Sequence, residues 1–297
     1  MKVVNFGSLN LDYLYHVPHT AVAGETISAK SYAISVGGKG LNQSIAAARA
    51  GVSVCHAGLV GKEGGILVDC LRESGVDVSL VQPTSAPQGH AMIQINDDGN
   101  NCIIVFGGSN QEVSREYIDQ TLEGMGPGDY VMVQNEVSNV GHIISAANAL
   151  GCTVVFNASP IDSSLLQLDY SQVDWLVVNE LEGMAIAGCE DIEGIIPALT
   201  EKFPELHIIL TLGGSGSLCS SGGQLWKQEA LPARVVDTTG AGDTFLGYCV
   251  AGLIRGDDIP TILRTATGAS SLAVSSLGAA ASIPCREQVM EYLAQHP

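Results

Sequence analysis

The sequence VDTTGAGDTF, residues 236–245, decides how the rest of the chain is interpreted. The apolar residues Ala233–Val236 predict the end of a short strand, and Phe245–Ile254 predicts a largely buried helix. Glycines at the junction allow a tight turn that brings backbone N–H groups up to an anion at the start of the helix. Asp243 lies in the first helical turn. It is either a base beside a transferred phosphoryl group or an ordinary helix cap, and this stretch alone leaves both interpretations open.

The composition of the 297-residue chain indicates a large α/β protein. The chain is 46% hydrophobic but only 5% aromatic and has 35 glycines, which suits helices packed closely on a parallel sheet. Its formal net charge is −18, and the acidic residues are scattered. Nucleic acids and anionic membrane surfaces both require basic patches, so we expect neither as a partner.

The eight cysteines form no C-x-x-C pair and mostly lie in apolar runs. We therefore expect buried, reduced thiols rather than disulfides or a zinc site. The chain begins directly with an apolar strand and without a signal peptide, and no apolar run approaches the length of a membrane span. These features predict a cytoplasmic protein.

Strands and helices alternate along most of the chain. Val3–Leu9 predicts a first strand that ends at Asn10 and is followed by Asp12. In the middle third, four apolar segments each end in polar or glycine residues: Tyr130–Val133, Cys152–Phe156, Trp175–Val178 and His207–Leu212. This repetition predicts a doubly wound, mainly parallel sheet flanked by helices, with a ligand cleft along its carboxyl edge. We expect one domain over residues 1–297.

Two segments interrupt this alternation. Glu25–Val36 alternates polar and apolar residues, and Gly89–Gly107 contains two apolar strands around a glycine-containing loop. We interpret these regions, about residues 13–36 and 89–108, as a small inserted β sheet that is either a lid over a site or a dimer surface. Apolar residues on both faces favour its being covered.

A second glycine-rich helix start occurs at Gly37-Gly38-Lys39-Gly40, with Asn42 close behind and Gly51 ending the helix. It is not a Walker loop, which needs G-x-x-x-x-G-K-[ST]. The motif is either a ligand site that contains a cation or a glycine turn with a solvated lysine.

Two further motifs follow strands. Asn179 and Glu182 are three residues apart at a helix start, so they either face a metal-bound phosphate together or form a helix cap and a surface carboxylate. Gly213–Gly216 joins two apolar segments but does not match G-x-G-x-x-G, which disfavours dinucleotide binding.

Together these motifs resemble the ribokinase-like (phosphofructokinase-B-type) family of carbohydrate kinases, most closely its ribose-phosphorylating members. Gly37–Gln43 looks like the first signature of the family, Asp237–Phe245 like the second, and Asn179–Glu182 like its N-x-x-E motif. The resemblance runs essentially from end to end and implies the α/β fold of the family with a small β lid.

The resemblance implies a role for each site residue. Asp243 would be the general base, and the N–H groups of Gly240, Ala241 and Gly242 would stabilise the charge on the transferred group. Residues that would hold the sugar together with Asp243 are Asn10, Asp12, Gly38, Lys39, Asn42 and Glu136. Residues that would border ATP together with Gly242 are Asn179, Thr211, Gly213 and Gly216.

The resemblance also implies two metal ions. Asn179 and Glu182 would order Mg²⁺ through water. A monovalent cation, K⁺ by resemblance, would be held by Asp237, Thr239, Ala273, Ser276, Gly278 and Ser282. Two positions depart from the family pattern: Thr267 replaces a common histidine near the adenine, and Ala281 replaces a common proline.

The function implied is ATP-dependent phosphorylation of the primary 5-hydroxyl of D-ribose to ribose 5-phosphate. The alternatives are a kinase of the same family for deoxyribose, fructose or a nucleoside, and a non-catalytic sugar-binding protein on this fold. The resemblance further implies a homodimer formed through the lid.

Overall fold

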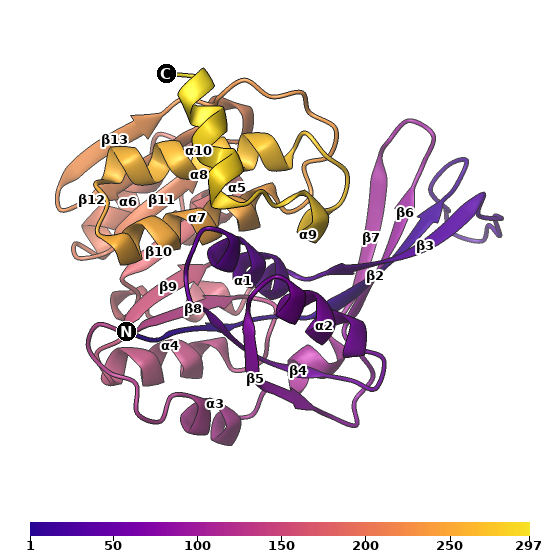
Figure 1. Cartoon of the computed structure of the whole chain (residues 1–297), viewed down its shortest axis with the longest axis horizontal. Coiled ribbons are helices and arrows are strands. Elements are labelled where there is room, and N and C mark those ends of the chain that lie inside the picture. The colour runs from indigo at the N-terminus through magenta and orange to yellow at the C-terminus, as the bar shows by residue number, and fades with distance from the viewer.

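A nine-stranded sheet forms the centre of the molecule, in a computed structural model that describes all residues, Met1–Pro297 (Figure 1). Its strand order is β13-β12-β11-β10-β9-β8-β1-β4-β5. The seven strands from β11 to β5 pair in parallel, β12 pairs antiparallel with β11, and β13 pairs antiparallel with β12. Their bounds are β1 Val3–Phe6, β4 Cys55–Val60, β5 Asp77–Pro83, β8 Tyr130–Gln134, β9 Thr153–Asn157, β10 Trp175–Asn179, β11 His207–Thr211, β12 Ser217–Ser221 and β13 Gln224–Gln228. The predicted doubly wound sheet is confirmed.

Helices cover both faces of this sheet because alternate strand residues point to opposite sides. Met132 of β8 packs in one buried cluster, whereas its neighbours Val131 and Val133 pack in the other. The first face carries α1 (Lys39–Arg49), α2 (Gly65–Glu73), α7 (Ala241–Arg255), α8 (Ile259–Ala273), α9 (Ala279–Ser282) and α10 (Arg286–Gln295). The second carries α3 (Arg115–Thr121), α4 (Val140–Ala149), α5 (Glu180–Ala187) and α6 (Ile195–Lys202). None of these helices is both long and apolar enough to cross a membrane.

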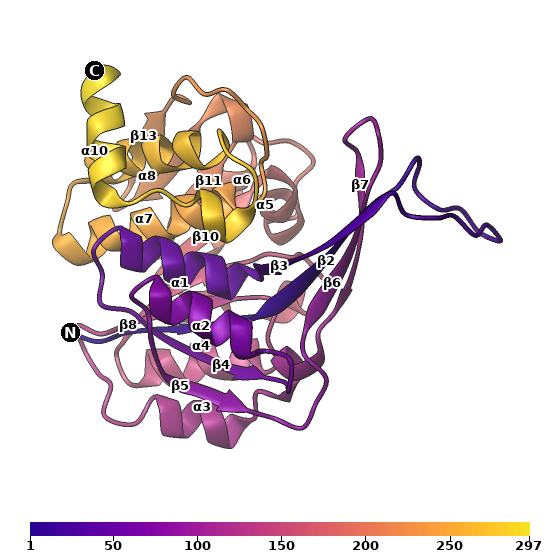
Figure 2. The same cartoon turned by 45° about the vertical axis from the view of Figure 1, so that its right-hand side comes forward.

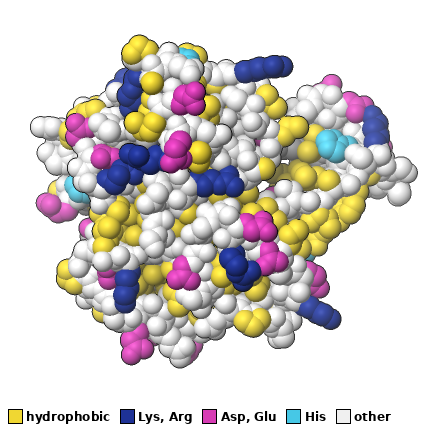
Figure 3. Space-filling view, viewed as in Figure 1, with side chains coloured by type: hydrophobic (Ala, Val, Ile, Leu, Met, Phe, Trp, Pro, Cys, Tyr) yellow, Lys and Arg dark blue, Asp and Glu magenta, His cyan; other side chains and the backbone are white.

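A four-stranded sheet projects from the body (Figures 1 and 2). Its strand order is β3-β2-β6-β7, with bounds β2 Asn10–His16, β3 Ser31–Gly37, β6 His90–Ile95 and β7 Asn101–Phe106. The two predicted irregular regions therefore join in one small sheet. The expectation that both its faces are covered is wrong within this chain, because every residue of β7 is exposed. Figure 3 shows hydrophobic side chains gathered over the projecting sheet.

The predicted first strand is too long. β1 ends at Phe6, and Asn10 already begins β2 of the small sheet. The segment between the two strands begins at Gly7, where a Cβ atom would lie 2.4 Å from Gly40 Cα, so only glycine fits this close approach to the start of α1. Asn10 and Asp12 then belong to the small sheet.

The strand predicted at Ala233–Val236 is absent. This segment follows edge strand β13, and the N–H groups of Val236 and Asp237 both donate to the carbonyl of Val274 just beyond α8. Val235 is 65% exposed. Without a neighbouring strand to pair with, the apolar residues form a loop beside α8 instead.

The cysteines are all free thiols, as expected, but burial holds for only three of them. Cys152, Cys219 and Cys249 are buried, Cys102 is exposed on β7, and Cys55, Cys70, Cys189 and Cys285 are partly exposed. An apolar run around a cysteine therefore did not predict whether the thiol is buried.

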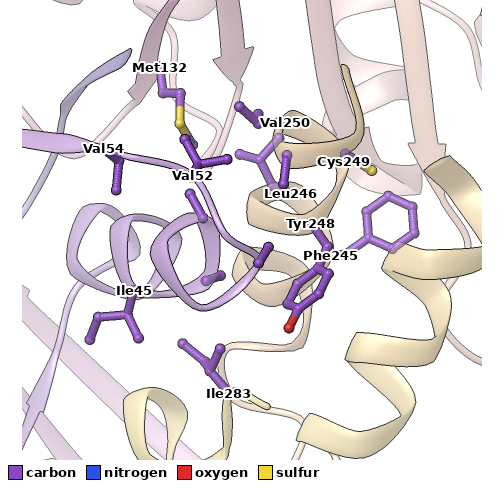
Figure 4. Packing of buried hydrophobic residues seen from close by; sticks show 14 of the residues in the cluster. Ile45, Val52, Val54, Met132, Phe245, Leu246, Tyr248, Cys249, Val250 and Ile283 are labelled. Carbon is purple, nitrogen blue, oxygen red and sulfur yellow. The ribbon is translucent and has the colours of Figure 1, made fainter. Parts of the chain in front are cut away.

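Helices α1 and α7 pack unusually closely, and Figure 4 shows side chains from both meeting in the core. A Cβ atom on Gly247 of α7 would lie 2.4 Å from Ala46 Cβ and 2.7 Å from Ala47 N of α1. The small residues thus bring the first turns of the two helices together, which places Asn42 beside Asp243.

Gly247→Ala should therefore lower the free energy of unfolding by about 1–3 kcal/mol, because the added methyl group overpacks this contact. Thermal unfolding measures the loss. Gly65→Ala in α2 is the matched control, since its Cβ would meet open space. Equal melting temperatures for the two variants would contradict the close-packing account.

Candidate active site

The candidate site lies where the strand order of the large sheet reverses. The chain builds β4 and β5 on one side of β1 and then returns to place β8 on the other side. Loops that follow β1 and β8 consequently separate and leave a crevice at the carboxyl edge, where α/β folds bind ligands. Ser8 after β1 and Glu136 after β8 contact each other across this crevice through a short hydrogen bond.

Asp243 is buried, with 7% of its surface exposed, at the third position of α7. Its Oδ2 accepts a hydrogen bond from Asn42 Nδ2 at 3.0 Å, and its Oδ1 accepts one from Gln43 Nε2 at 2.9 Å. The N-cap of α7 is Gly240, not Asp243. The helix-cap interpretation of Asp243 is therefore wrong, because the carboxylate faces α1 rather than its own helix end.

The start of α7 presents free backbone donors beside this carboxylate. Gly240 has a left-handed backbone (φ 76°) that suits glycine. The N–H groups of Gly242 and Asp243 have no acceptor in the protein. The N–H of Ala241, by contrast, donates to the Thr238 carbonyl at 3.2 Å. Of the three N–H groups expected to stabilise a transferred group, those of Gly240 and Gly242 have no acceptor and that of Ala241 does, while the Asp243 N–H is a further free donor. Anion binding by these groups stays a prediction.

A polar cavity of about 210 Å³ lies next to the small sheet. Of the residues expected to hold a sugar, Asn10 and Glu136 line it, whereas Asp12, Gly38, Lys39 and Asn42 do not. A hydrogen bond connects the residues that line the cavity with those that do not, because Lys39 N–H donates to Glu136 Oε2 at 3.0 Å. The remaining lining residues are Val105, Gly107, Asn110, Gln111, Asn135 and Pro160.

Charges of both signs meet near this cavity. Burial works against the charge of the partly buried Lys39, but the carboxylates of Asp243, Glu136 and Glu182 outweigh it and raise the pKa of the ammonium group. Lys39 is therefore the local positive charge that an anionic ligand requires in this acidic protein, and it is not a solvated surface lysine.

Asp12 carries the opposite perturbation. Burial and, second, the nearby charge of Glu136 raise its pKa from 3.8 to about 7. The side chain lies against Gly37, where a Cβ atom would be 2.1 Å from Asp12 Oδ2. The folded protein therefore holds a carboxyl group that resists ionisation until something in the site compensates its charge.

Asp12→Asn should stabilise the ligand-free protein at alkaline pH. The pKa of about 7 in the folded state exceeds the unfolded value of 3.8, so the folded state binds the extra proton between these values and the free energy of unfolding falls as pH rises through this window. The variant should lack this fall and melt higher above neutral pH, by up to about 4 kcal/mol or roughly 8 °C. Melting curves at several pH values measure it, and parallel pH profiles for both proteins would contradict it.

A larger cavity of about 510 Å³ is bordered by the first residues of α7, Ala241 and Gly242. All five residues expected to border ATP line it, namely Asn179, Thr211, Gly213, Gly216 and Gly242. Gly216 has φ 94°, and a Cβ atom there would lie 2.0 Å from the Gln228 carbonyl oxygen. Thr267 also lines the cavity, and its buried Oγ1 has no hydrogen-bond partner. The volume and the glycine-rich wall fit a nucleotide.

Asn179 and Glu182 form a helix cap. Asn179 Oδ1 accepts from Glu182 N–H at 3.0 Å, and Glu182 Oε2 accepts from Asn179 N–H at 2.9 Å. Glu182 is nevertheless buried rather than a surface residue, and its Oε1 has no protein donor. The cap fixes the Glu182 carboxylate next to Asn179, which lines the nucleotide-sized cavity, and leaves Oε1 free. Such an oxygen fits Mg²⁺, which takes one or two carboxylates and completes its shell with water and phosphates.

The residues expected around a monovalent cation come from two loops that Asp237 ties together. Its Oδ1 accepts from the N–H and Oγ1 of Thr239 at 2.9 and 2.7 Å, and its Oδ2 accepts from Gly278 N–H at 3.0 Å. Although burial works against the charge, these hydrogen bonds lower the pKa of Asp237. The other expected ligands donate locally: Ser276 N–H to the Ala273 carbonyl and Ser282 Oγ to the Ala279 carbonyl. An ionised carboxylate among carbonyl and hydroxyl oxygens suits such a cation.

Sequence reasoning missed residues that support the expected ones. Gln43 contacts Asp243 directly and lay inside the quoted signature, so its position next to Asn42 was an available signal. Asn110 fixes Asn10 by donating to its Oδ1 at 2.8 Å. No sequence pattern predicted Asn110, because it lies in a short 3₁₀ turn that is 100 residues from Asn10 in the chain.

The site defines a class of enzyme. A buried carboxylate beside free helix N–H groups, with one cavity of nucleotide size bordered by Gly242 and one polar cavity lined by Asn10 and Glu136, is the arrangement of a phosphotransferase that acts on an alcohol group. The polar cavity suits a hydroxylated acceptor because each buried hydroxyl needs a hydrogen-bond partner.

Comparison with known proteins gives the family. A model of the pfkB family carbohydrate kinases matches residues 1–286. Ribokinase of Haemophilus influenzae is 30% identical over 97% of this chain and 96% of its own length, and ribokinase of Staphylococcus aureus is 33% identical over 97% and 98%. The crystal structure of Cryptococcus neoformans ribokinase with ADP superposes with a TM-score of 0.85 at 33% identity, covering 98% of this chain and 99% of that one. The chain belongs to the pfkB family of carbohydrate kinases, and it is a phosphotransferase that acts on a sugar hydroxyl.

Proposed function

We propose that this protein is a ribokinase, which transfers the γ-phosphoryl group of ATP to the 5-hydroxyl of D-ribose and releases ribose 5-phosphate and ADP. The observation that carries the proposal is the buried Asp243 carboxylate held by α1 beside the free N–H groups of Gly242 and Asp243. Supporting it, the structure of Arabidopsis thaliana ribokinase complexed with ribose and ATP superposes with a TM-score of 0.85 at 29% identity.

In this reaction Asp243 takes the proton of the 5-hydroxyl as its oxygen attacks the γ-phosphorus. The bond to the bridging oxygen breaks, and ADP leaves with the electron pair. General base catalysis of this kind contributes about 10²–10⁴ in rate. The free N–H groups at the start of α7 stabilise the charge on the transferred group, and Lys39, which is near enough to feel the charge of Asp243, adds a positive charge.

The sugar lies between the small sheet and the start of α1. Asp12 and Glu136 accept from its hydroxyl groups, the free Nδ2 of Asn10 donates to them, and Gly38, Lys39 and Asn42 contribute from the glycine turn. Asn110 keeps the amide of Asn10 in one orientation. Burial raises the pKa of Asp12 in the ligand-free protein. When ribose binds, its hydroxyl groups donate to this carboxyl group and compensate the burial of its charge.

ATP occupies the larger cavity bordered by Asn179, Thr211, Gly213, Gly216 and Gly242. Glu182, held by the helix cap, would hold Mg²⁺ together with Asn179. When bound, Mg²⁺ neutralises charge on the phosphates.

A monovalent cation, K⁺, is proposed beside the start of α7. Asp237, Thr239, Ala273, Ser276, Gly278 and Ser282 hold it, several through backbone carbonyls. Because Thr238 and Gly240 connect this loop to α7, a bound cation would fix the position of the free N–H groups at the start of α7. Activation by K⁺ and the cytoplasmic location both stay predictions.

The small sheet, about residues 13–36 and 89–108, is proposed as a lid over the sugar and as a homodimer contact within a single domain. Cross-strand partners lie on one face, so Asp12 and Ala91 share a face with Val105, which lines the polar cavity. The row Tyr13, Ile34, Met92 and Ile104 lies on the opposite face. Ile34, Met92 and Ile104 are 52%, 42% and 59% exposed, which favours a partner on this outer face.

Ile104→Glu should therefore turn a dimer into a monomer, because it buries a charge in the interface. Sedimentation velocity measures the change, and the exposed Leu225→Glu on β13 is the control. A monomeric wild-type protein would contradict the proposed contact.

A coupled assay of ADP release over a panel of sugars, with and without K⁺, tests the function. Ribose should give the highest kcat/KM. Deoxyribose is the main competitor, since the deoxyribokinase of Salmonella typhi is also 30% identical over 99% of this chain. Turnover of fructose or a nucleoside but not of ribose would replace the proposal by another kinase of the family, and no turnover of any sugar would leave only sugar binding.

A further inference from the structure

We propose that Gln43 is a positioning residue that fixes the plane of the Asp243 carboxylate, and that Asn157 at the end of β9 anchors it. This inference rests on the proposed function, because it concerns the orientation of the general base. Gln43 is fully buried, and its Nε2 lies 2.9 Å from Asp243 Oδ1 and 3.2 Å from Asn157 Oδ1.

The hydrogen bonds allow only one orientation of the two amides. Asn157 Nδ2 donates to the Val177 carbonyl at 3.1 Å, which can only accept, so Asn157 must turn its Oδ1 toward Gln43. Gln43 then faces two acceptors, Asn157 Oδ1 and a carboxylate oxygen. Both must be met by Nε2, which has two hydrogens to give. A flipped Gln43 would place its Oε1 against both of these oxygens.

The fixed amide of Gln43 determines the orientation in which the Asp243 carboxylate faces the sugar. Asn42 Nδ2 holds Asp243 Oδ2, and Gln43 Nε2 holds Asp243 Oδ1, so the carboxylate cannot rotate without losing a hydrogen bond. Each oxygen keeps lone pairs for the incoming proton. Neutral amides suit this task because they hold the ionised carboxylate without offering it a proton.

The anchor connects the base to the rigid centre of the protein. From the Val177 carbonyl in β10, the chain of hydrogen bonds runs through Asn157 and Gln43 to Asp243. Asn157 does not contact Asp243 itself, so its influence on the reaction must pass through Gln43. Asn42 has no such anchor, because its Oδ1 is buried without a partner.

The test measures the chemical step by single-turnover kinetics and ribose binding by calorimetry. Gln43→Leu keeps the volume but removes both donors, and we expect the rate of phosphoryl transfer to fall about 100-fold because the base loses its orientation. The dissociation constants of ribose and ATP should stay within about threefold, since Gln43 holds the base rather than the ligands. Should Gln43→Leu fail to fold, Gln43→Met is measured in the same way.

The anchor is tested by a double-mutant cycle. Asn157→Ala alone should lower the transfer rate about tenfold and should have no further effect in the Gln43→Leu background. Gln134→Leu is the matched control for the loss of a buried amide. Gln134 is fully buried and pairs with Asn157 across β8 and β9, but its side chain donates to Asn5 Oδ1 and makes no hydrogen bond to Gln43, Asn157 or Asp243. Its transfer rate should stay within about threefold of wild type.

Three results would overturn the inference: an unchanged transfer rate in Gln43→Leu, an Asn157→Ala effect that persists without Gln43, or an equal loss in the Gln134→Leu control. None of them bears on the proposed function if the wild-type protein phosphorylates ribose. Conversely, a wild-type protein that turns over no sugar refutes the function and leaves the fixed amide as a structural feature only.

Discussion

Asp243→Asn should lower kcat for ribose phosphorylation by about 10³-fold, the largest effect expected of any substitution in this protein. The asparagine cannot take the proton of the 5-hydroxyl. It also turns an amide donor toward either Asn42 or Gln43, both of which donate to the native carboxylate. The same substitution should therefore lower the melting temperature slightly, while ribose and ATP still bind.

Steady-state kinetics with a melting curve separate these effects. Asp257→Asn is the matched control, because Asp257 is a carboxylate just beyond the other end of α7 whose partner is Arg255. It should retain wild-type kcat. A folded Asp243→Asn protein with wild-type turnover would remove Asp243 from the role of base.

Gly240→Ala should have the second largest effect, a loss of about 10²-fold in kcat, because it disturbs the free N–H groups at the start of α7. Gly240 has φ 76°, and an added Cβ atom would lie 3.0 Å from the Cβ of Ala279. The alanine must therefore leave the left-handed conformation or push away the start of α9, to which Ala279 belongs. Either movement displaces the donors that face the transferred group.

The other end of the same helix offers a control. Gly256 caps α7 with φ 74°, and a Cβ atom there would meet open space. Gly256→Ala should cost similar stability through its backbone but leave kcat unchanged. If both variants lose the same fraction of kcat, the effect comes from strain in α7 and not from the anion site.

The parallel core was predictable because its signal is local. Each apolar segment such as Trp175–Val178 carries its own pattern and ends in polar residues, and the rules of chain connection order the units. Ala233–Val236 has the same composition but no neighbouring strand with which to pair. Strand formation there depends on a partner that the local sequence does not encode.

The site was predictable to the level of its signatures. Motifs identified Asp243, Lys39 and the nucleotide border, which lie together as expected. Details that depend on hydrogen-bond competition were not predictable. The N–H of Ala241 is used by the Thr238 carbonyl, and Glu182 serves the helix cap with one oxygen while the other stays free.

Exposure was the least predictable property. Apolar runs predicted buried cysteines and a covered small sheet, yet Cys102 and its neighbours on β7 are exposed in the single chain. Burial on a projecting sheet is decided by whatever packs on its outer face, and a second chain leaves no local mark in the sequence.

Identification of the product tests the proposed ribokinase activity most directly. Purified protein is incubated with ribose, ATP, Mg²⁺ and K⁺, and the phosphorus spectrum is followed by NMR. The account predicts a new phosphomonoester signal that couples to the two protons on C5, with ADP formed in equal amount. A phosphoester on another carbon of the sugar, or ATP that stays intact beside ribose, would contradict it.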